Sequence, residues 1–206
     1  GIRDTSVTGV QTCALPIYDC LLVDFQGVGG SSGNTITIGM KEAQDVVRSL
    51  QYAAELELPT PTILYGVSMG SVAIMRAIAQ EGITPDAVIL ELPFAHFLNA
   101  VRSRLRYHGL PAFPTAELLV FWGSVQHGVN GFRHNPIHFA PAINCPTLLI
   151  HGEQDKWTTV AEINELFANI TAPKQLVVSP EAGHHQLIGV DRALWDAQVT
   201  ELLNSV

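Results

Sequence analysis

The sequence predicts an α/β fold in which helices flank a mostly parallel sheet. Apolar segments of strand length alternate along the chain with segments of helical periodicity, the order typical of parallel sheets with covering helices. Hydrophobic residues make up 47% of the 206 residues and charged residues only 15%, which is enough apolar material for one sizeable core. Because no linker or repeat separates two such units, we expect a single domain.

Five strands and four helices follow from this alternation. In the first helix, Ala43, Val46, Leu50 and Ala54 recur at spacings of three and four and form one apolar stripe. In the last helix, Trp195 belongs to the same kind of stripe and is expected in the core. The strands are expected near 18–25, 61–66, 86–91, 146–151 and 175–179, and the helices near 40–57, 70–82, 160–170 and 191–205.

Residues 95–142 break the alternation. The stretch holds four prolines and several aromatic residues and has no clear strand, so we expect a small helical cap inserted over the carboxyl edge of the sheet. Its aromatic residues have two interpretations of equal weight: they line an apolar acyl or alcohol pocket, or they pack the cap onto the sheet. These residues are Phe113, Phe121, Trp122 and Phe132.

The glycine-rich stretch 27–33 follows the first expected strand but does not predict a phosphate-binding loop. It lacks the lysine of that motif, and no obvious helix begins at Asn34. We expect a loop at the rim of the site, which Asp24 holds by hydrogen bonds to its amides.

A G-x-S-x-G motif at residues 66–70 joins an apolar strand directly to a helix rich in small residues. In this context the motif predicts a sharp strand-to-helix turn that exposes the hydroxyl of Ser68 at a helix N-terminus. The turn leaves little room for side chains, and we expect Gly66 and Gly70 to be required for that reason. The motif alone is a weak signal, since glycine and serine are common in ordinary turns.

A serine hydroxyl needs a neighbouring base, and the base needs an orienting acid, before the serine can act as a nucleophile. Asp155 and His184 each follow an expected strand. The carboxyl ends of parallel strands share one edge of the sheet, so we expect Ser68, Asp155 and His184 to meet there. Glu153 and His185 are the weaker alternatives for the acid and the base.

Four stretches of the chain together resemble the α/β-hydrolase superfamily, and within it the serine esterase and serine aminopeptidase-like branch. The resemblance covers most of the chain from about residue 18 onward. It favours His184 over His185, because the histidine of the family directly follows a glycine. The stretches are Asp24–Gly33, Gly66–Gly70, Cys145–Asp155 and Ala182–His184.

The resemblance implies acyl transfer without a cofactor. Ser68 would be the nucleophile, His184 the general base and Asp155 the acid that orients the imidazole. The backbone N–H of Met69 would be one donor to the oxyanion, and a second donor would come from a loop before Tyr18. Serine at position 68 argues against dehalogenase or epoxide-hydrolase chemistry, which uses a carboxylate nucleophile.

The beginning of the chain carries a different resemblance. Residues 6–17 resemble the translation of a common sequencing adapter, and residues 1–5 resemble its continuation. We therefore interpret residues 1–17 as foreign and residues 18–206 as the hydrolase domain, truncated before its first strands and the loop of the second oxyanion donor. Loss of one such donor costs about 10²–10³ in kcat, so we expect the full-length protein to be an enzyme and this chain to be a poor one. A genuine N-terminal strand is the alternative.

Charge and composition argue against several other functions. The net charge of −8, without a basic tract, argues against nucleic-acid binding, and no apolar run is long enough to span a bilayer. The eight histidines are scattered, and Pro136 interrupts the pair His134 and His138, so we expect no metal site. Cys20 and Cys145 belong to expected core strands and are interpreted as buried thiols.

We expect a small-molecule substrate with a carboxylic ester bond. A peptidase or amidase of the aminopeptidase-like branch is the alternative, and it would need an acidic group, Glu91, Glu117 or Glu153, for the free amine of its substrate. A non-catalytic binding protein of the same fold is the third possibility, although such a protein has no need of the acid and the base. The oligomeric state and the location of the protein stay open.

Overall fold

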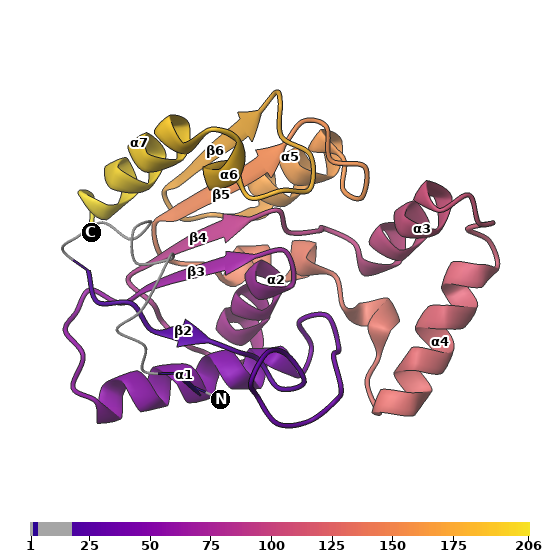
Figure 1. The fold of residues 1–206 in the computed structure, drawn as a ribbon, viewed down its shortest axis with the longest axis horizontal. Helices are drawn as coiled ribbons and strands as arrows, with labels where there is room; N and C mark the ends of the chain where they lie inside the picture. The colour runs from indigo at the N-terminus through magenta and orange to yellow at the C-terminus, as the bar shows by residue number, and fades with distance from the viewer. Residues whose placement is uncertain (1, 4–17) are drawn as a thin grey trace.

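A four-stranded parallel sheet forms the centre of the computed structural model, which describes residues 2–3 and 18–206 (Figure 1). The strands lie in the order β3–β4–β5–β6, and every neighbouring pair is parallel, which confirms the predicted α/β class. They also match four of the strands expected from the sequence. Their bounds are β3 Ile63–Val67, β4 Ala87–Glu91, β5 Thr147–Gly152 and β6 Lys174–Ser179.

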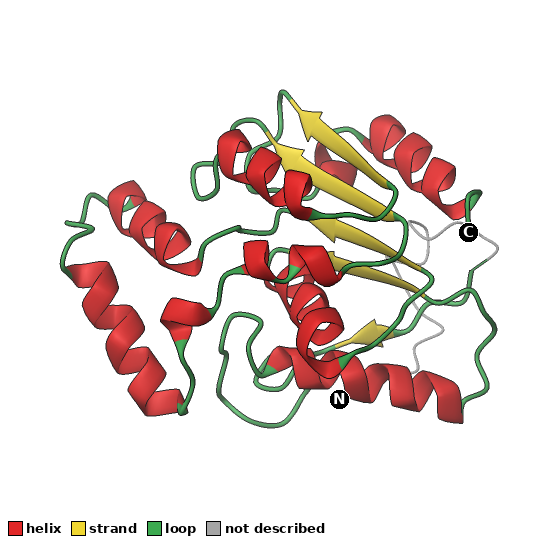
Figure 2. Ribbon diagram, turned by 180° about the vertical axis from the view of Figure 1, so that it is seen from behind, coloured by secondary structure: helices red, strands yellow, loops and turns green. Residues whose placement is uncertain are grey.

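Helices cover both faces of this sheet (Figures 1 and 2). One apolar cluster joins the sheet to α1, α2 and α5, and a second cluster joins its other face to α6 and α7. Trp195 lies in the second cluster, as expected. The bounds are α1 Glu42–Glu55, α2 Met69–Arg76, α5 Val160–Asn169, α6 Leu187–Val190 and α7 Arg192–Leu203.

Two helices differ from the expectation. The helix expected at 70–82 changes after α2 into a π-helical turn over Ala77–Glu81 and ends at Gly82, which has a left-handed conformation. The four residues of α6 were not predicted, because a single turn is too short to show helical periodicity.

The strand expected at 18–25 is reduced to two residues, β2 (Leu22–Val23). It pairs antiparallel with β1 (Ile2–Arg3) and has no hydrogen-bonded partner in the four-stranded sheet. The predicted strand is therefore present but shorter than expected, because only Leu22 and Val23 pair with a neighbouring strand. Of the segment 1–17, only residues 2–3 belong to the described residues, so its interpretation as foreign stays a prediction.

The two described cysteines differ in burial. Cys145 is buried beside β5, as expected, whereas Cys20 precedes β2 and is exposed, which corrects the prediction. Among the described residues both are free thiols. The prediction for Cys20 failed because the shortened strand does not include it.

Asp24 anchors the glycine-rich loop as predicted. Its carboxylate accepts a hydrogen bond from the N–H of Gly30 (2.8 Å), and its backbone carbonyl accepts one from the hydroxyl of Ser31 (2.6 Å). The loop is thereby closed on the end of β2 by side-chain and backbone acceptors of one residue.

The cap expected at 95–142 is helical and lies beyond the carboxyl ends of the strands (Figure 1). It consists of two α-helices followed by three short 3₁₀ turns. The helices are α3 Phe97–Tyr107 and α4 Thr115–His127, and the turns are Gly131–Arg133, Pro136–His138 and Ala140–Ala142.

The aromatic residues of the cap face solvent, which neither sequence interpretation anticipated. Phe113 is 76% exposed and Trp122 is 63% exposed, and Phe121 and Phe132 are exposed as well. The helix α4 buries only Ala116 and Val120, so most of its other apolar side chains point outward. A helix that is apolar all round cannot reveal from its sequence which side it buries.

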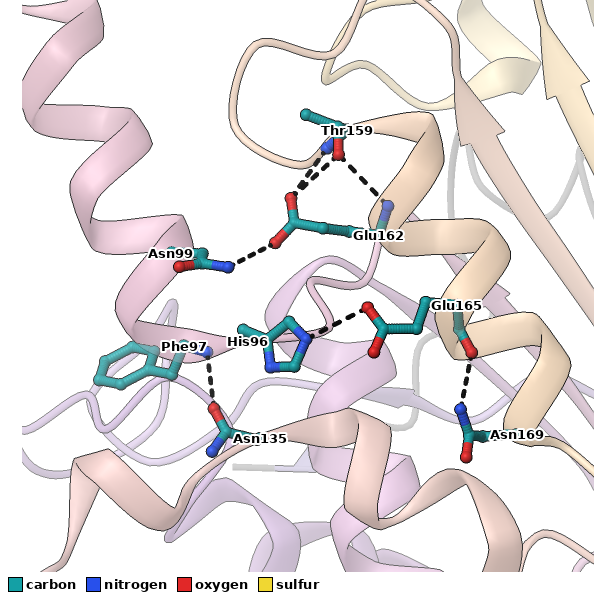
Figure 3. Close-up of polar contacts among 8 residues, drawn as sticks. All are labelled: His96, Phe97, Asn99, Asn135, Thr159, Glu162, Glu165 and Asn169. Carbon is teal, nitrogen blue, oxygen red and sulfur yellow. Dashed lines mark hydrogen bonds and ion pairs between the residues drawn. The ribbon is translucent and has the colours of Figure 1, made fainter.

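Polar contacts fix the base of the cap to the core helix α5 (Figure 3). Glu162 forms a capping box with Thr159 at the start of α5, and its other carboxylate oxygen accepts a hydrogen bond from the side chain of Asn99 in α3 (3.1 Å). A longer contact joins His96 to Glu165 (3.5 Å). One glutamate therefore caps a core helix and holds the cap.

We predict that Glu162→Ala lowers the free energy of unfolding by about 1–2 kcal/mol, because it removes half of the capping box and the bond to Asn99. Urea unfolding followed by circular dichroism measures this change. Glu165→Ala on the same helix is the matched control and should stay within about 0.5 kcal/mol of the wild type, since its contact is exposed. Equal effects of the two substitutions would contradict the assigned role of Glu162.

Candidate active site

Ser68 occupies a strained turn between β3 and α2. Its backbone has φ 50° and ψ −108°, values that L-residues rarely adopt, and its own N–H donates to the carbonyl of Glu91 in β4 (2.7 Å). The residue stands directly before the first residue of α2. The turn therefore holds the hydroxyl at the carboxyl end of the sheet and at a helix N-terminus, as the motif predicted.

The two glycines of the motif differ in their requirement for space. A Cβ atom added to Gly66 would lie 2.5 Å from the backbone of Gly70 and Ser71, so no other residue fits there. A Cβ atom at Gly70 would meet no described atom within 4 Å. The expectation that Gly70 is sterically required was wrong, because the space that a side chain would enter at this position is open.

The structure brings the side chains of Ser68, Asp155 and His184 together in one chain of hydrogen bonds. The Nε2 atom of His184 lies 3.0 Å from the Oγ atom of Ser68, and its Nδ1 atom lies 2.7 Å from Oδ2 of Asp155. The three residues come from the turns that follow β3, β5 and β6. A hydroxyl, an imidazole and a carboxylate in this order can pass a proton from the hydroxyl to the ring.

The carboxylate of Asp155 is buried and fully hydrogen-bonded. Its second oxygen, Oδ1, accepts from the backbone N–H groups of Trp157 (2.7 Å) and Thr158 (3.3 Å). Burial alone would raise the pKa of Asp155, but the hydrogen bonds from His184 and Trp157 outweigh it and the pKa is lowered. The residue is thus held as a carboxylate that faces the imidazole.

The alternative acid and base lie outside this chain of hydrogen bonds. Glu153 is exposed, and its backbone N–H donates a hydrogen bond to the carbonyl of Ser179 (2.9 Å). His185 is also exposed, whereas His184 is half-buried against the ring of Trp157, with 4.2 Å between the ring centroids.

The N–H of Met69 has the position expected of an anion donor. As the first residue of α2 it has no hydrogen-bond acceptor within the helix, and it lines the cavity that contains Ser68. The expected second donor falls before Tyr18, where residues 4–17 lie outside the described residues.

Glu91 connects several parts of the site through hydrogen bonds. Its side chain is completely buried at the end of β4 and accepts hydrogen bonds from the hydroxyl of Tyr65 (2.6 Å) and from the backbone N–H of Leu187. Its carbonyl accepts from Ser68 and from the hydroxyl of Ser71 (2.9 Å). Burial raises the pKa of Glu91, and its hydrogen bonds oppose that shift. Sequence reasoning missed this role.

The three glutamates considered for binding a substrate amine do not line the cavity at Ser68. Glu91 is enclosed by its own partners, and Glu117 pairs with Arg102 within the cap. Neither of these residues lines the cavity at Ser68, and nor does Glu153. Among the described residues, the lining of this cavity includes none of the three glutamates proposed to hold a substrate amine.

The hydroxyl of Ser68 opens into a small cavity of about 50 Å³ under the cap. A larger apolar cavity of about 220 Å³ lies between α3, α4 and the loop around residues 36–40. The two cavities share the side chains of Ile38, Phe97 and Val101 as a common wall. Apolar space is thus adjacent to the reactive hydroxyl.

The described residues contain no group of three or more histidine, cysteine, aspartate or glutamate side chains placed to hold a metal ion. Every helix in the described part of the chain is too short or too polar to cross a bilayer. His134 and His138, which the sequence analysis rejected as a ligand pair because of Pro136, are not part of such a group among the described residues.

Comparison with known proteins gives a consistent result. A model of the alpha/beta hydrolase family matches residues 10–194. The lysophosphatidylserine lipase ABHD12 of Danio rerio is 28% identical over 149 residues, which cover 67% of this chain and 36% of the relative. The mitochondrial palmitoyl-protein thioesterase ABHD10 of Homo sapiens is 26% identical over 161 residues, which cover 71% of this chain and 51% of the relative. The chain thus spans about a third to a half of these curated relatives.

Solved structures show the same fold. The esterase PF2001 of Pyrococcus furiosus superposes with a TM-score of 0.75 at 23% identity, covering 91% of this chain and 70% of the esterase. The ABHD10 protein of mouse superposes with a TM-score of 0.61 at 22% identity, covering 88% of this chain and 76% of that protein. At these sequence identities, the structural likeness shows the fold alone.

We predict that Gly66→Ala destabilises the protein by about 3 kcal/mol or more, because the added methyl group meets backbone atoms that cannot move without opening the turn. Gly70→Ala is the matched substitution and should leave the free energy of unfolding within about 0.5 kcal/mol of the wild type or raise it. Thermal unfolding of the two variants side by side measures the difference. Comparable losses would show that the close approach at Gly66 is misassigned.

A second prediction concerns acid stability. Because the folded pKa of Asp155 is lowered, its contribution to stability is complete above its unfolded pKa and is lost as the pH falls through the folded value. Asp155→Asn should therefore lower the free energy of unfolding at neutral pH by about 1–3 kcal/mol and flatten its decline in acid. Urea titrations at several pH values measure both effects, with the exposed Glu201→Gln as control. An unchanged acid profile would contradict this role.

Proposed function

Because the chain belongs to the alpha/beta hydrolase family, we propose that it hydrolyses carboxylic esters through a covalent acyl-enzyme on Ser68. One observation supports this proposal above all: the hydroxyl of Ser68, the imidazole of His184 and the carboxylate of Asp155 form a continuous hydrogen-bonded chain. The strained turn at Ser68 supports it further, since strain at a nucleophile is retained where it serves the reaction.

In the first half of the reaction, the Oγ atom of Ser68 attacks the carbonyl carbon of the ester. Nε2 of His184 takes the hydroxyl proton as the new bond forms, and Asp155 stabilises the imidazolium without taking the proton itself. The N–H of Met69 donates to the developing oxyanion. The bond to the alcohol oxygen then breaks, and the alcohol leaves with the proton from His184.

In the second half, a water molecule attacks the acyl carbon of the acyl-enzyme. His184 takes one proton from this water, and the carboxylic acid is released when the bond to Oγ of Ser68 breaks. The same proton returns from His184 to Oγ, which restores the starting state. The imidazole ring needs one fixed orientation throughout the reaction. Asp155 fixes this orientation through its hydrogen bond with Nδ1 of His184.

Two observations favour esters over peptides as substrates. The apolar cavity next to Ser68 suits an acyl chain, and the described residues that line the cavity at Ser68 include no carboxylate to hold a free amine. The relatives named as a lysophosphatidylserine lipase and a palmitoyl-protein thioesterase cleave acyl groups, which agrees with an esterase or thioesterase reaction here. A non-catalytic binding protein would have no use for a hydrogen-bonded acid and base.

We predict that a fluorophosphonate probe labels the protein at Ser68 and that Ser68→Ala abolishes the labelling, because the probe needs an activated serine. Gel fluorescence and mass spectrometry of the labelled peptide measure this. Ser103→Ala in the cap should leave labelling intact. Labelling that survives in the Ser68→Ala variant would disprove the nucleophile, and a folded wild type without labelling would favour a binding protein.

The adjacent histidines offer a matched pair for the base. His184→Ala should lower kcat for a simple 4-nitrophenyl ester by about 10²–10⁴, whereas His185→Ala should change it by no more than a few-fold. Both variants carry the same loss of an imidazole in the same loop, so equal effects would exclude His184 as the specific base.

A further inference from the structure

One cationic side chain of the cap lies beside the reactive group. Arg104 of α3 lines the cavity at Ser68, and its guanidinium carbon lies 4.5 Å from the ring centroid of Trp157. The ring of Trp157 in turn contacts the ring of His184, with 4.2 Å between the centroids and an angle of 48° between the ring planes. A positive charge is thus separated from the proposed base by a single aromatic ring.

This charge has no ion-pair partner among the described residues. Arg102, two residues earlier in the same helix, pairs with Glu117, whereas no described carboxylate lies within ion-pair distance of Arg104. The nearby carboxylate of Asp155 is occupied by His184 and two backbone N–H groups. Arg104 as a residue is exposed, so an incoming anion can reach its side chain.

The aromatic ring holds this guanidinium in place. A cation over the face of a tryptophan is attracted to the ring, and the planar group keeps its N–H donors free at its edge. An arginine fixed in this way loses less conformational freedom on binding an anion than a freely rotating one. The arrangement is therefore a prepared site for a carboxylate or a phosphate.

The cavity at Ser68 has an apolar side and a cationic side. Val101 lies on the wall shared with the larger apolar cavity, and Arg104 follows it one turn later on the same helix. Beyond this wall lies the apolar cavity of about 220 Å³, which suits an acyl chain. The cationic side carries Trp157 and His184.

The mechanism assigns the two halves of an ester to these two sides. His184 gives its proton to the leaving alcohol, so the alcohol oxygen must lie on the side of His184. The acyl chain then extends toward the apolar cavity, and the alcohol extends toward Trp157 and Arg104.

We propose that the substrates are esters that join an apolar acyl chain to an alcohol carrying a phosphate or a carboxylate, and that Arg104 binds this anion. The proposal rests on the ester hydrolysis proposed above and specifies its substrate class. Arg104 acts here as a specificity-determining residue, through charge-assisted hydrogen bonds to the alcohol half of the substrate.

Two matched pairs of substrates test the proposal. Octanoyl glycerol phosphate is compared with monooctanoyl glycerol, and octanoyl glycolate is compared with octanoyl glycolamide, so each pair differs in one anionic group. The wild type should cleave the anionic member of at least one pair about tenfold more efficiently, measured as kcat/KM by release of octanoate. That preference should shrink as the salt concentration rises, because salt screens an exposed charge.

Substitutions identify the group responsible. Arg104→Gln should reduce the ratio of anionic to neutral kcat/KM about tenfold, mainly through KM, and should abolish its salt dependence. Arg104→Lys should restore part of the ratio. Arg106→Gln, an exposed arginine of the same helix that does not line the cavity, should keep the wild-type ratio. A purely structural role of Arg104 would lower both members of a pair alike.

Each result decides the proposal. A preference in both pairs supports a general anion site, and a preference in the phosphate pair alone supports a site for phosphate. Neutral esters cleaved as well as anionic ones, or a ratio that survives Arg104→Gln, would overturn the anion site while leaving ester hydrolysis intact. A wild type that cleaves neither member would overturn the proposed function, and the anion site with it.

Discussion

A buried glutamate at the end of β4 is the constraint on which the rest of the site depends. The carbonyl of Glu91 accepts from the N–H of Ser68, and its carboxylate accepts from the N–H of Leu187, three residues after His184. The two loops that carry the serine and the histidine are therefore tied to one residue. Without this tie, the 3.0 Å contact between Ser68 and His184 would depend on two independently moving turns.

Such a tie is costly to build. A carboxylate removed from water is stable only when strong hydrogen bonds replace its hydration, and Tyr65 and Leu187 supply them. The strained backbone of Ser68 adds a second energetic cost. The close packing at Gly66 and the hydrogen bond from Ser68 to Glu91 hold the backbone in this conformation. The core on both faces of the sheet stabilises these features, so the site draws on the stability of the whole domain.

The cap contributes part of the wall around Ser68. Its base is fixed to α5 by Glu162 and Asn99, while its helix α3 presents Val101 and Arg104 to the reactive hydroxyl. In the proposed reaction, the scaffold beneath the cap positions the acyl-transfer groups, and the cap would select the esters that reach them. Changes in a few cap residues could therefore alter substrate preference without disturbing the strands or the loops that hold the proposed catalytic groups.

The sequence by itself determined the α/β class, four of the strands and the three side chains of the hydrogen-bonded chain. Ser68, Asp155 and His184 could be predicted because each lies in the turn after a strand, and parallel strands end at a common edge. The role of Glu91 could not be predicted from the sequence, since its partners Tyr65 and Leu187 lie 26 and 96 residues away. The length of β2 and the exposure of the cap aromatics were equally hidden, because both depend on which neighbour a segment meets. Tertiary structure decided these features, since hydrogen-bonding edges, burial and the direction of a helix face exist only once distant segments have packed together.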